Sequence, residues 1–202
     1  MYLSRWTLHK NEILEHRMYE DYRIHQTVYS LFPFEGERHF LYSAVSQNFS
    51  SLVILIQSES KPVEPGFGRL EVKVIPEDFF DGGKYLFQVK FSPVVQSVNG
   101  KDRPVKSENE LVSWLKARED GWGISIDYER ILKVGDGTMV MRQKGNSNRV
   151  IVSYVELTGL LSVTDRDKFM KTVKAGIGRS KGFGFGLLQL KPIFQEEKDG
   201  RE

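Results

Sequence analysis

Residues 176–186 read Gly176-Ile177-Gly178-Arg179-Ser180-Lys181-Gly182-Phe183-Gly184-Phe185-Gly186, with five glycines in eleven positions. A basic helical pattern precedes this stretch and the apolar run 187–190 follows it, so it joins a helix to a final strand. Glycine lets backbone N–H groups converge on an anion, and the two cations add positive charge. The sequence therefore predicts an ordered phosphate-binding loop. The residues expected to contact the phosphate there are Gly176, Gly178, Arg179, Ser180, Lys181, Gly182, Phe183, Gly184 and Gly186.

A flexible linker is the alternative interpretation of these glycines. Linkers are usually padded with serine and threonine, whereas Phe183 and Phe185 alternate with glycine here and lead into an apolar strand. Walker and Rossmann loops follow a strand and open a helix, which is the reverse of the order in this chain. The sequence favours a fixed loop of another kind.

Composition excludes several classes of site. The chain has 202 residues, is 40% hydrophobic and contains no cysteine, so it predicts a folded, soluble protein without disulfides, cysteine-ligated zinc or a thiol nucleophile. The four histidines show no metal-ligand spacing, and neither a metal nor another cofactor is expected. The longest apolar run, 52–56, is too short to cross a bilayer. No membrane partner is expected, and the expected compartment is the cytoplasm.

Positive charge is concentrated in the last third of the chain. Between Thr138 and Lys191 there are ten lysines and arginines against three acidic residues. Such an excess is the usual footprint of a polyanion partner, although many charged runs are only solvated surface. Three of these cations, Arg142, Lys144 and Arg149, surround a polar turn between two expected strands. They predict a basic hairpin that would contact such a polyanion, the alternative being a solvated turn.

The order of expected elements predicts an α+β protein with two tandem ferredoxin-like (RRM-like) βαββαβ domains. In the first half we expect strands at 1–9, 40–42, 52–56 and 84–91 and a helix from Asp21 to Pro33, with a proline-rich connection before the last strand. In the second half we expect helices capped by Ser107 and by Thr164-Asp165, separated by the hairpin. The expected divisions are a domain at 1–92, a domain at 93–194 and a disordered tail at 195–202.

Several motifs match one known family. They are Met1-Tyr2-Leu3-Ser4, the segment from Tyr22-Arg23-Ile24-His25-Gln26 to Leu31-Phe32-Pro33, Trp114-Leu115, Gly159-Leu160-Leu161-Ser162-Val163-Thr164-Asp165, and the glycine loop with Leu187-Leu188. Together they resemble the CasE (Cse3) family of CRISPR repeat-processing endoribonucleases over nearly the whole chain. One segment departs from the family pattern: Ser92-Pro93-Val94-Val95-Gln96 stands where an Asn-Pro-Thr followed by basic residues is expected. The RNA contact of that segment is not carried over.

The resemblance implies a metal-independent ribonuclease that cuts a CRISPR repeat beside its stem-loop. Attack by the 2′-hydroxyl leaves a 2′,3′-cyclic phosphate and a 5′-hydroxyl. The implied partners are the repeat RNA and the other subunits of the Cascade complex, in which the protein stays on its mature product, with no DNA bound directly. The resemblance also raises His25 and Tyr22 to candidate catalytic residues.

The chemistry of these two residues agrees with that role. They lie three apart on one helix face, beside the apolar stripe of the same helix. Histidine titrates close to neutral pH and can act as acid or base, and which of these roles His25 has stays open. A phenol is a poor general base at neutral pH, so Tyr22 is expected to orient the phosphate. On the helix alone, a hydrogen-bonded histidine at the edge of the core is the commoner case.

Two other functions remain open. One is a non-catalytic subunit that binds an RNA hairpin and leaves cleavage to another nuclease. The other is a structural subunit of a ribonucleoprotein that touches RNA only incidentally. Cleavage of a labelled hairpin in excess chelator distinguishes all three.

Overall fold

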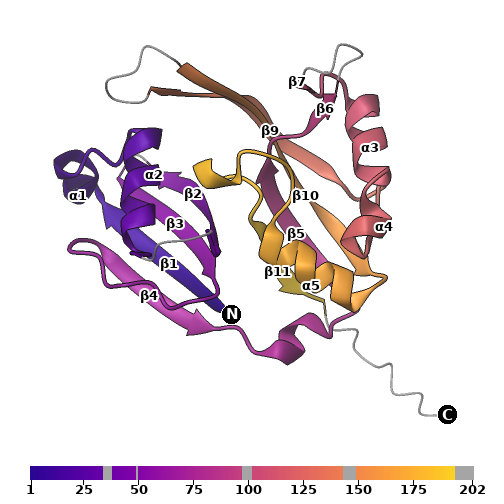
Figure 1. Cartoon of the computed structure of the whole chain (residues 1–202), viewed down its shortest axis with the longest axis horizontal. Helices are drawn as coiled ribbons and strands as arrows, with labels where there is room; N and C mark the ends of the chain where they lie inside the picture. The colour runs from indigo at the N-terminus through magenta and orange to yellow at the C-terminus, as the bar shows by residue number, and fades with distance from the viewer. Residues whose placement is uncertain (34–37, 49, 97–101, 143–148, 194–202) are drawn as a thin grey trace.

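Two antiparallel sheets lie side by side, each with helices on one face (Figure 1). This computed structural model describes residues 1–33, 38–48, 50–96, 102–142 and 149–193. Each sheet has the strand order of a ferredoxin-like unit, so the predicted α+β class and tandem arrangement are confirmed. The tail expected at 195–202 lies outside the described residues.

The first sheet has the strand order β2-β3-β1-β4. Its strands are β1 (Tyr2–His9), β2 (Phe40–Asn48), β3 (Ser51–Ser58) and β4 (Arg69–Val74). One face packs under α1 (Lys10–Glu15) and α2 (Asp21–Ser30). The two-residue period of β1 directs Trp6 and Leu8 into this core, where they meet Ile24 and Val28 of α2. The apolar spacing that predicted the helix is therefore the face that holds it on the sheet.

Strand β3 is covered on both faces, which explains its nearly continuous apolar sequence. Ile54 and Ile56 pack in the core beneath α2, whereas Leu55 and Gln57 alternate with them and point toward the second unit. The sheet thus joins the two halves of the molecule as well as forming the first core.

The second sheet has the order β11-β5-β10-β8, with β9 also paired to β10. Helices α3, α4 and α5 accompany it, with α3 and α5 packed on its core. Its elements are β5 (Lys84–Phe91), α3 (Glu108–Lys116), α4 (Glu119–Trp122), β8 (Ile124–Ile126), β9 (Leu132–Arg142), β10 (Arg149–Val163), α5 (Arg166–Ala175) and β11 (Leu188–Pro192). A short ribbon of β6 (Val94–Gln96) and β7 (Asp102–Pro104) and the one-turn helices η1 (Glu77–Phe80) and η2 (Lys181–Phe183) complete the fold.

The assignment of β5 corrects the prediction from sequence. We expected this strand to close the first domain, with the division at residue 92, but it pairs with β10 and β11 and opens the second sheet. Strand β4 closes the first sheet instead. Its residues are mostly exposed and lie between proline-rich segments, so it lacks the apolar run that marks a buried strand. Within the fully described stretch 50–96, the chain passes from β3 to β4 without a helix.

Local signals in the second unit correctly placed its helices. The hydroxyl of Ser107 accepts a hydrogen bond from the N–H of Glu110 at the start of α3, and Asp165 caps α5 through the N–H of Lys168. Phe169 and Val173 of α5 are buried as expected. Both caps satisfy N–H groups that a helix start leaves without partners.

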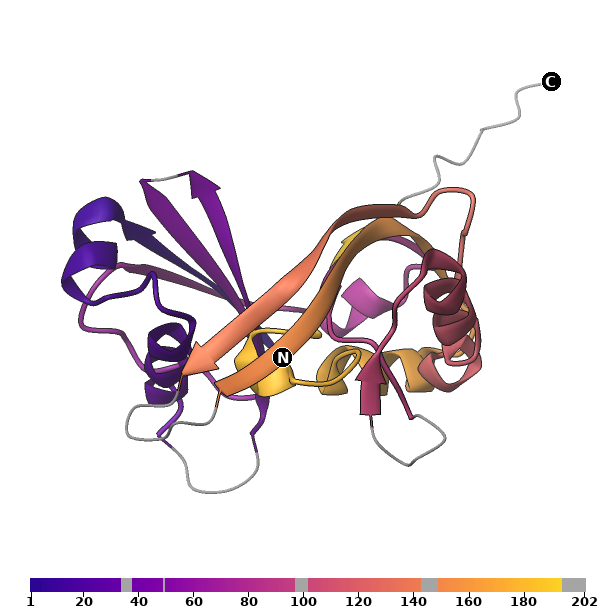
Figure 2. The ribbon, with the colours of Figure 1, turned by 90° about the horizontal axis from the view of Figure 1, so that it is seen from above.

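Strands β9 and β10 form a long hairpin that leaves the second sheet and reaches α2 in the first unit (Figure 2). Its described end pairs Arg142 with Arg149. The chain therefore brings the end of a basic hairpin beside the helix that carries His25. Among the described helices, none is long and apolar enough to cross a membrane.

Candidate active site

The glycine loop leaves α5 and crosses between the two units before it enters β11. Its glycines allow a backbone that other residues resist, since φ is positive at Gly176, Gly178, Gly184 and Gly186. They also allow close contact: a Cβ on Gly184 would lie 2.9 Å from the ring of Tyr42. The loop is therefore an ordered element packed against the first sheet, and the linker interpretation is wrong.

Several N–H groups of the loop are already used inside the protein. Those of Ile177 and Gly186 donate to the carbonyl oxygens of Gly186 and Lys90, and that of Arg179 donates to Ser92. These three N–H groups are therefore not available to the predicted phosphate nest, because a bound phosphate would have to displace hydrogen bonds within the fold. The outer glycines of the loop mainly allow close packing. The middle of the loop, around Gly182, is the part that faces the candidate site.

His25 is the centre of that site. Its Nδ1 lies 2.8 Å from the carbonyl oxygen of Gly182, so α2 of the first unit meets the loop of the second. A carbonyl oxygen can only accept a hydrogen bond, and Nδ1 must therefore carry the proton. In the neutral ring this leaves Nε2 with a free lone pair. The arrangement leaves Nε2 as the ring nitrogen available for proton exchange with a bound molecule.

Aromatic rings surround the imidazole. The ring of Tyr29 lies 4.3 Å from that of His25, the ring of Phe183 lies at 5.2 Å, and the ring of Tyr22 lies roughly parallel at 6.0 Å, all measured between centroids. Phe183, which we expected to touch RNA, thus helps to hold the imidazole. The structure brings Tyr22 and His25 together as the helical spacing predicted.

Arg38 and Lys181 bring two positive charges to this part of the protein. A guanidinium nitrogen of Arg38 lies 3.1 Å from the position that a Cβ on Gly182 would occupy, and the hydroxyl of Tyr29 lies 3.0 Å from it. The neighbouring Lys181 is half-buried, and its pKa is lowered by burial and by the charge of Arg38. Sequence reasoning missed Arg38, because no motif marks it and only the fold brings it to a loop more than a hundred residues away.

The structure places the other residues predicted to contact RNA in different surroundings. The backbones of Arg142 and Arg149 end the hairpin that reaches α2, whereas Lys144 lies outside the described residues. Arg179 forms an exposed ion pair with Asp102. Ser180 has a positive φ of 58° and precedes η2. The loop therefore contacts His25, and the hairpin reaches the helix that carries it.

The segment that departs from the family pattern has a structural role. The carbonyl oxygen of Ser92 accepts from Arg179, and that of Val94 accepts from the indole of Trp114 at 2.8 Å. These bonds anchor the start of the β6–β7 ribbon to the glycine loop and to α3. The segment that departs from the family pattern therefore supports the glycine loop.

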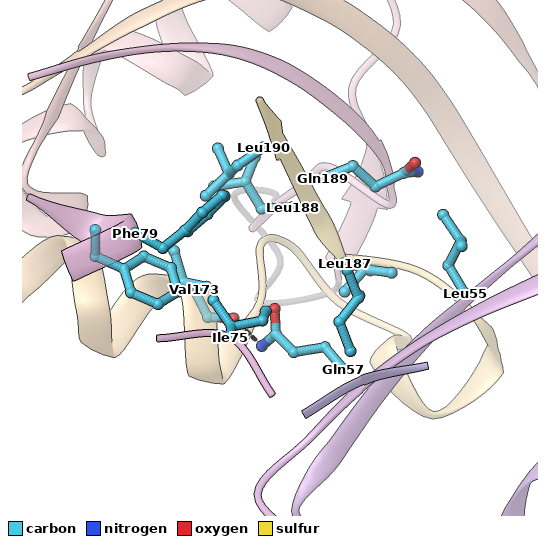
Figure 3. Close-up of a pocket in the computed structure, with 11 residues that line it drawn as sticks. Leu55, Gln57, Ile75, Phe79, Val173, Leu187, Leu188, Gln189 and Leu190 are labelled. Atoms are coloured by element: carbon cyan, nitrogen blue, oxygen red, sulfur yellow. Dashed lines mark hydrogen bonds between the residues drawn. The ribbon is translucent and has the colours of Figure 1, made fainter. Parts of the chain in front are cut away.

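A cavity of about 220 Å³ lies elsewhere, between the first sheet, α5 and β11. Figure 3 shows its lining, which includes Leu55, Ile75, Phe79 and Leu187, with Gln57 as one of its few polar groups. It contains no charged side chain, so it offers nothing for proton transfer. Within the described ranges, no group of three or more histidine, aspartate or glutamate side chains is placed to hold a metal ion.

Comparison with known proteins gives a consistent result. The family described as CRISPR associated protein matches residues 1–192. The Cascade subunit CasE of Escherichia coli K12 is 23% identical over 188 residues, which cover 85% of this chain and 92% of CasE. The CRISPR-associated endoribonuclease Cse3 of Thermus thermophilus is 26% identical over 154 residues, or 69% of this chain and 73% of Cse3. A structure of Thermus thermophilus Cse3, bound to an RNA that represents a pre-cleavage complex, superimposes with a TM-score of 0.81 at 21% identity and covers 95% of this chain and 98% of the other.

Proposed function

Because this chain belongs to the CRISPR associated protein family, which matches residues 1–192, we propose that it is an endoribonuclease that binds the stem-loop of a CRISPR repeat and cuts the precursor RNA beside the stem. The relatives named CasE and Cse3 support the substrate class. The single observation that carries the activity is the hydrogen bond between His25 and the carbonyl of Gly182.

That hydrogen bond gives His25 a defined chemical role. Cleavage begins when the 2′-oxygen of one nucleotide attacks the adjacent phosphorus and loses its proton. The bond from phosphorus to the 5′-oxygen then breaks, and that oxygen takes up a proton. Nε2 of His25 serves one of these two transfers, since Nδ1 is held by the loop. The products are a 2′,3′-cyclic phosphate and a 5′-hydroxyl, and every step uses atoms of the RNA and the protein.

Tyr22 has a supporting part in this scheme. Its ring lies roughly parallel to that of His25 on the same face of α2. A phenol hydroxyl in that position can donate a hydrogen bond to a non-bridging phosphate oxygen and orient the phosphorus for in-line attack. The proposal therefore gives orientation to Tyr22 and proton transfer to His25.

The remaining predicted residues hold the RNA. Arg142, Lys144 and Arg149 of the hairpin are proposed to follow the backbone of the stem, while Arg179, Lys181 and the glycine loop hold the strand near the cut. Backbone charge contacts supply affinity, and the A-form shape of the stem supplies much of the selectivity. Retention of the cut RNA and assembly with other Cascade subunits are proposed by analogy with CasE, which is named as a Cascade subunit.

A single-turnover cleavage assay with a radiolabelled repeat hairpin tests the proposal. The wild-type protein should cut equally well with or without excess chelator. A 2′-deoxy sugar at the scissile nucleotide should abolish cutting but preserve binding, because it removes only the nucleophile. His25→Ala should slow cleavage about a hundredfold or more, the usual contribution of a positioned acid or base, and change the Kd less than about threefold.

His39→Ala is the matched control, since His39 is an exposed histidine paired only with Glu59 at 3.7 Å among the described residues. Its cleavage rate should equal that of the wild type. An absolute requirement for magnesium, or normal cleavage by His25→Ala, contradicts the proposed mechanism. Binding of the hairpin without any cleavage supports the non-catalytic subunit instead, and equal affinity for hairpin and unstructured RNA supports the purely structural subunit.

A further inference from the structure

We infer that Arg38 and Lys181 form a seat for one phosphate group of the substrate beside His25, and that Arg38 is a catalytic residue that stabilises the negative charge of the phosphorane. The inference rests on the proposed endoribonuclease function and adds a residue that no motif in the sequence marks.

Position is the first argument. Gly182 separates the two groups that matter: its carbonyl oxygen holds His25, and the guanidinium of Arg38 lies on its Cα side, 3.1 Å from where a Cβ would be. Lys181 is the preceding residue of the chain. The imidazole and the guanidinium therefore meet at Gly182, and the pKa of the neighbouring Lys181 responds to the charge of Arg38. We place one phosphodiester at this part of the loop.

The second argument is that neither cation has an acidic partner among the described residues. The ion pairs found among the described residues include neither Arg38 nor Lys181, although eight other lysines and arginines of that part of the chain are paired. The Nε of Arg38 is buried without a hydrogen-bond partner. A buried donor without a partner is costly. The fold maintains this arrangement, and an anion would relieve it.

The two cations also repel each other. Burial and the charge of Arg38 together lower the pKa of Lys181. An opposite charge placed between them would favour the charged form of Lys181 and satisfy the guanidinium of Arg38. The group that would complete the pair is therefore negative, and no ion pair of the described residues supplies it.

Chemistry identifies the anion as a phosphodiester. The planar guanidinium presents parallel N–H groups that match two oxygens of a phosphate, and the hydroxyl of Tyr29 adds a donor at the same point of the loop. His25 is held at that point too, through the carbonyl of Gly182. A phosphate bound here has its ester oxygens next to an acid–base group.

Arg38 should affect catalysis more than binding. A phosphodiester in the ground state carries one negative charge, and the pentacoordinate phosphorane carries more. A fixed cation therefore stabilises the transition state more strongly than the bound substrate. Only such a difference accelerates the reaction, so the rate constant at saturation is the quantity that reports it.

The experiment compares Arg38→Ala, Arg38→Lys and a control, Arg69→Ala. Arg69 is an exposed arginine on β4 whose partner is Glu71, so its loss changes the net charge equally without touching the seat. Three quantities are measured: the single-turnover rate at saturating protein, the Kd of the 2′-deoxy hairpin at several salt concentrations, and the Tm.

Arg38→Ala should lose about a hundredfold in rate, with the Kd raised less than about fivefold and the slope of log Kd against log salt reduced by about one. Arg38→Lys should keep the charge and recover part of the rate. Millimolar guanidinium should partly restore cleavage by Arg38→Ala, because it can occupy the vacated space, and should not restore His25→Ala. A residue with only a structural role gives no such rescue.

Outcomes separate this inference from the proposed function. Wild-type cleavage that depends on His25 but is unchanged in Arg38→Ala overturns the inference alone. A drop in Tm with loss of binding in both Arg38 variants, and no rescue by guanidinium, overturns it as well. A wild-type protein that cuts no RNA overturns the proposed function and the catalytic role together, and an unchanged salt slope overturns the phosphate seat.

Discussion

The side-chain amide of Gln57 donates a hydrogen bond of 2.7 Å to the main-chain carbonyl oxygen of Val173. This bond joins the far face of the first sheet to the last turn of α5, where helix carbonyls have no partner within the helix. Gln57 is 5% exposed. It is thus a buried polar bridge between the two units, in the wall of the apolar cavity shown in Figure 3.

Gln57→Leu should lower the free energy of unfolding by about 1–3 kcal/mol, because it leaves the carbonyl of Val173 buried without a donor. Denaturant unfolding checks this result. Gln189→Leu is the control, since Gln189 lines the same cavity and has no side-chain hydrogen bond within the described residues. Equal stability of both variants would show that the bridge contributes nothing.

Gly184→Ala should destabilise the protein by about 1–3 kcal/mol, since φ is +86° and the added Cβ would lie 2.9 Å from Tyr42. A loop that only bound phosphate would lose RNA affinity more than stability on this change, whereas the contact with β2 predicts loss of both. The Tm measures the effect. Gly66→Ala should change it little, because a Cβ on Gly66 has no neighbour within 4 Å. A Gly184→Ala protein as stable as Gly66→Ala would contradict the packing argument.

Asp102→Asn should tighten hairpin binding and steepen its salt dependence, because it releases Arg179 from its ion pair and removes one negative charge near the loop. Arg179→Ala should reduce the salt slope by about one unit or less. The control is Asp81→Asn, which breaks the comparable exposed pair with Arg166. Titrations at two or more salt concentrations are sufficient. No gain in affinity for Asp102→Asn would place Arg179 away from the RNA.

Because of Lys181, the stability of the protein should rise and its affinity for RNA should fall as the pH becomes alkaline. Its pKa in the folded protein is lowered by burial and by Arg38 from the ordinary value of 10.5, so the unfolded chain binds more protons between the two values. Stability contributed by this group therefore rises with pH across that window. Affinity for the hairpin should fall across it, because the lysine loses its charge. Lys181→Met should remove both trends, and parallel curves for wild type and variant would exclude this role.

Tyr22→Phe should reduce the single-turnover rate about tenfold, the effect of losing one hydrogen bond to a charged phosphate. The Kd should stay nearly constant, since the ring beside His25 remains. Tyr19→Phe serves as the control, because Tyr19 is 61% exposed just before α2. A loss as large as that of His25→Ala would instead assign proton transfer to Tyr22.

Much of the fold could be predicted because its signals are local. The helical spacing of Ile24 and Val28 placed α2, and the caps at Ser107 and Asp165 placed two helices of the second unit. The failures were not local. Strand β4 is an exposed edge strand without an apolar run. The sheet to which β5 belongs depends on its pairing with β10, about 70 residues later in the chain.

The candidate site follows the same division. Tyr22 and His25 could be paired from their spacing on one helix, and the resemblance to a known family gave them a role. Arg38 could not be found, because only the fold brings its guanidinium beside Gly182, in the other half of the chain. The use of glycine-loop N–H groups inside the fold was equally invisible, since two of the acceptors are the carbonyl oxygens of Lys90 and Ser92, in a segment remote in sequence.

The hydrogen bond between His25 and Gly182 spans 157 residues of chain, and this has a consequence during translation. The ribosome makes α2 early, but the carbonyl that fixes the imidazole, the basic hairpin and Lys181 are all made much later. Under the proposed mechanism, a nascent chain with only its first sheet has His25 without the residues proposed to hold and orient the RNA. Under that mechanism, cutting therefore awaits synthesis of the segment that carries the glycine loop.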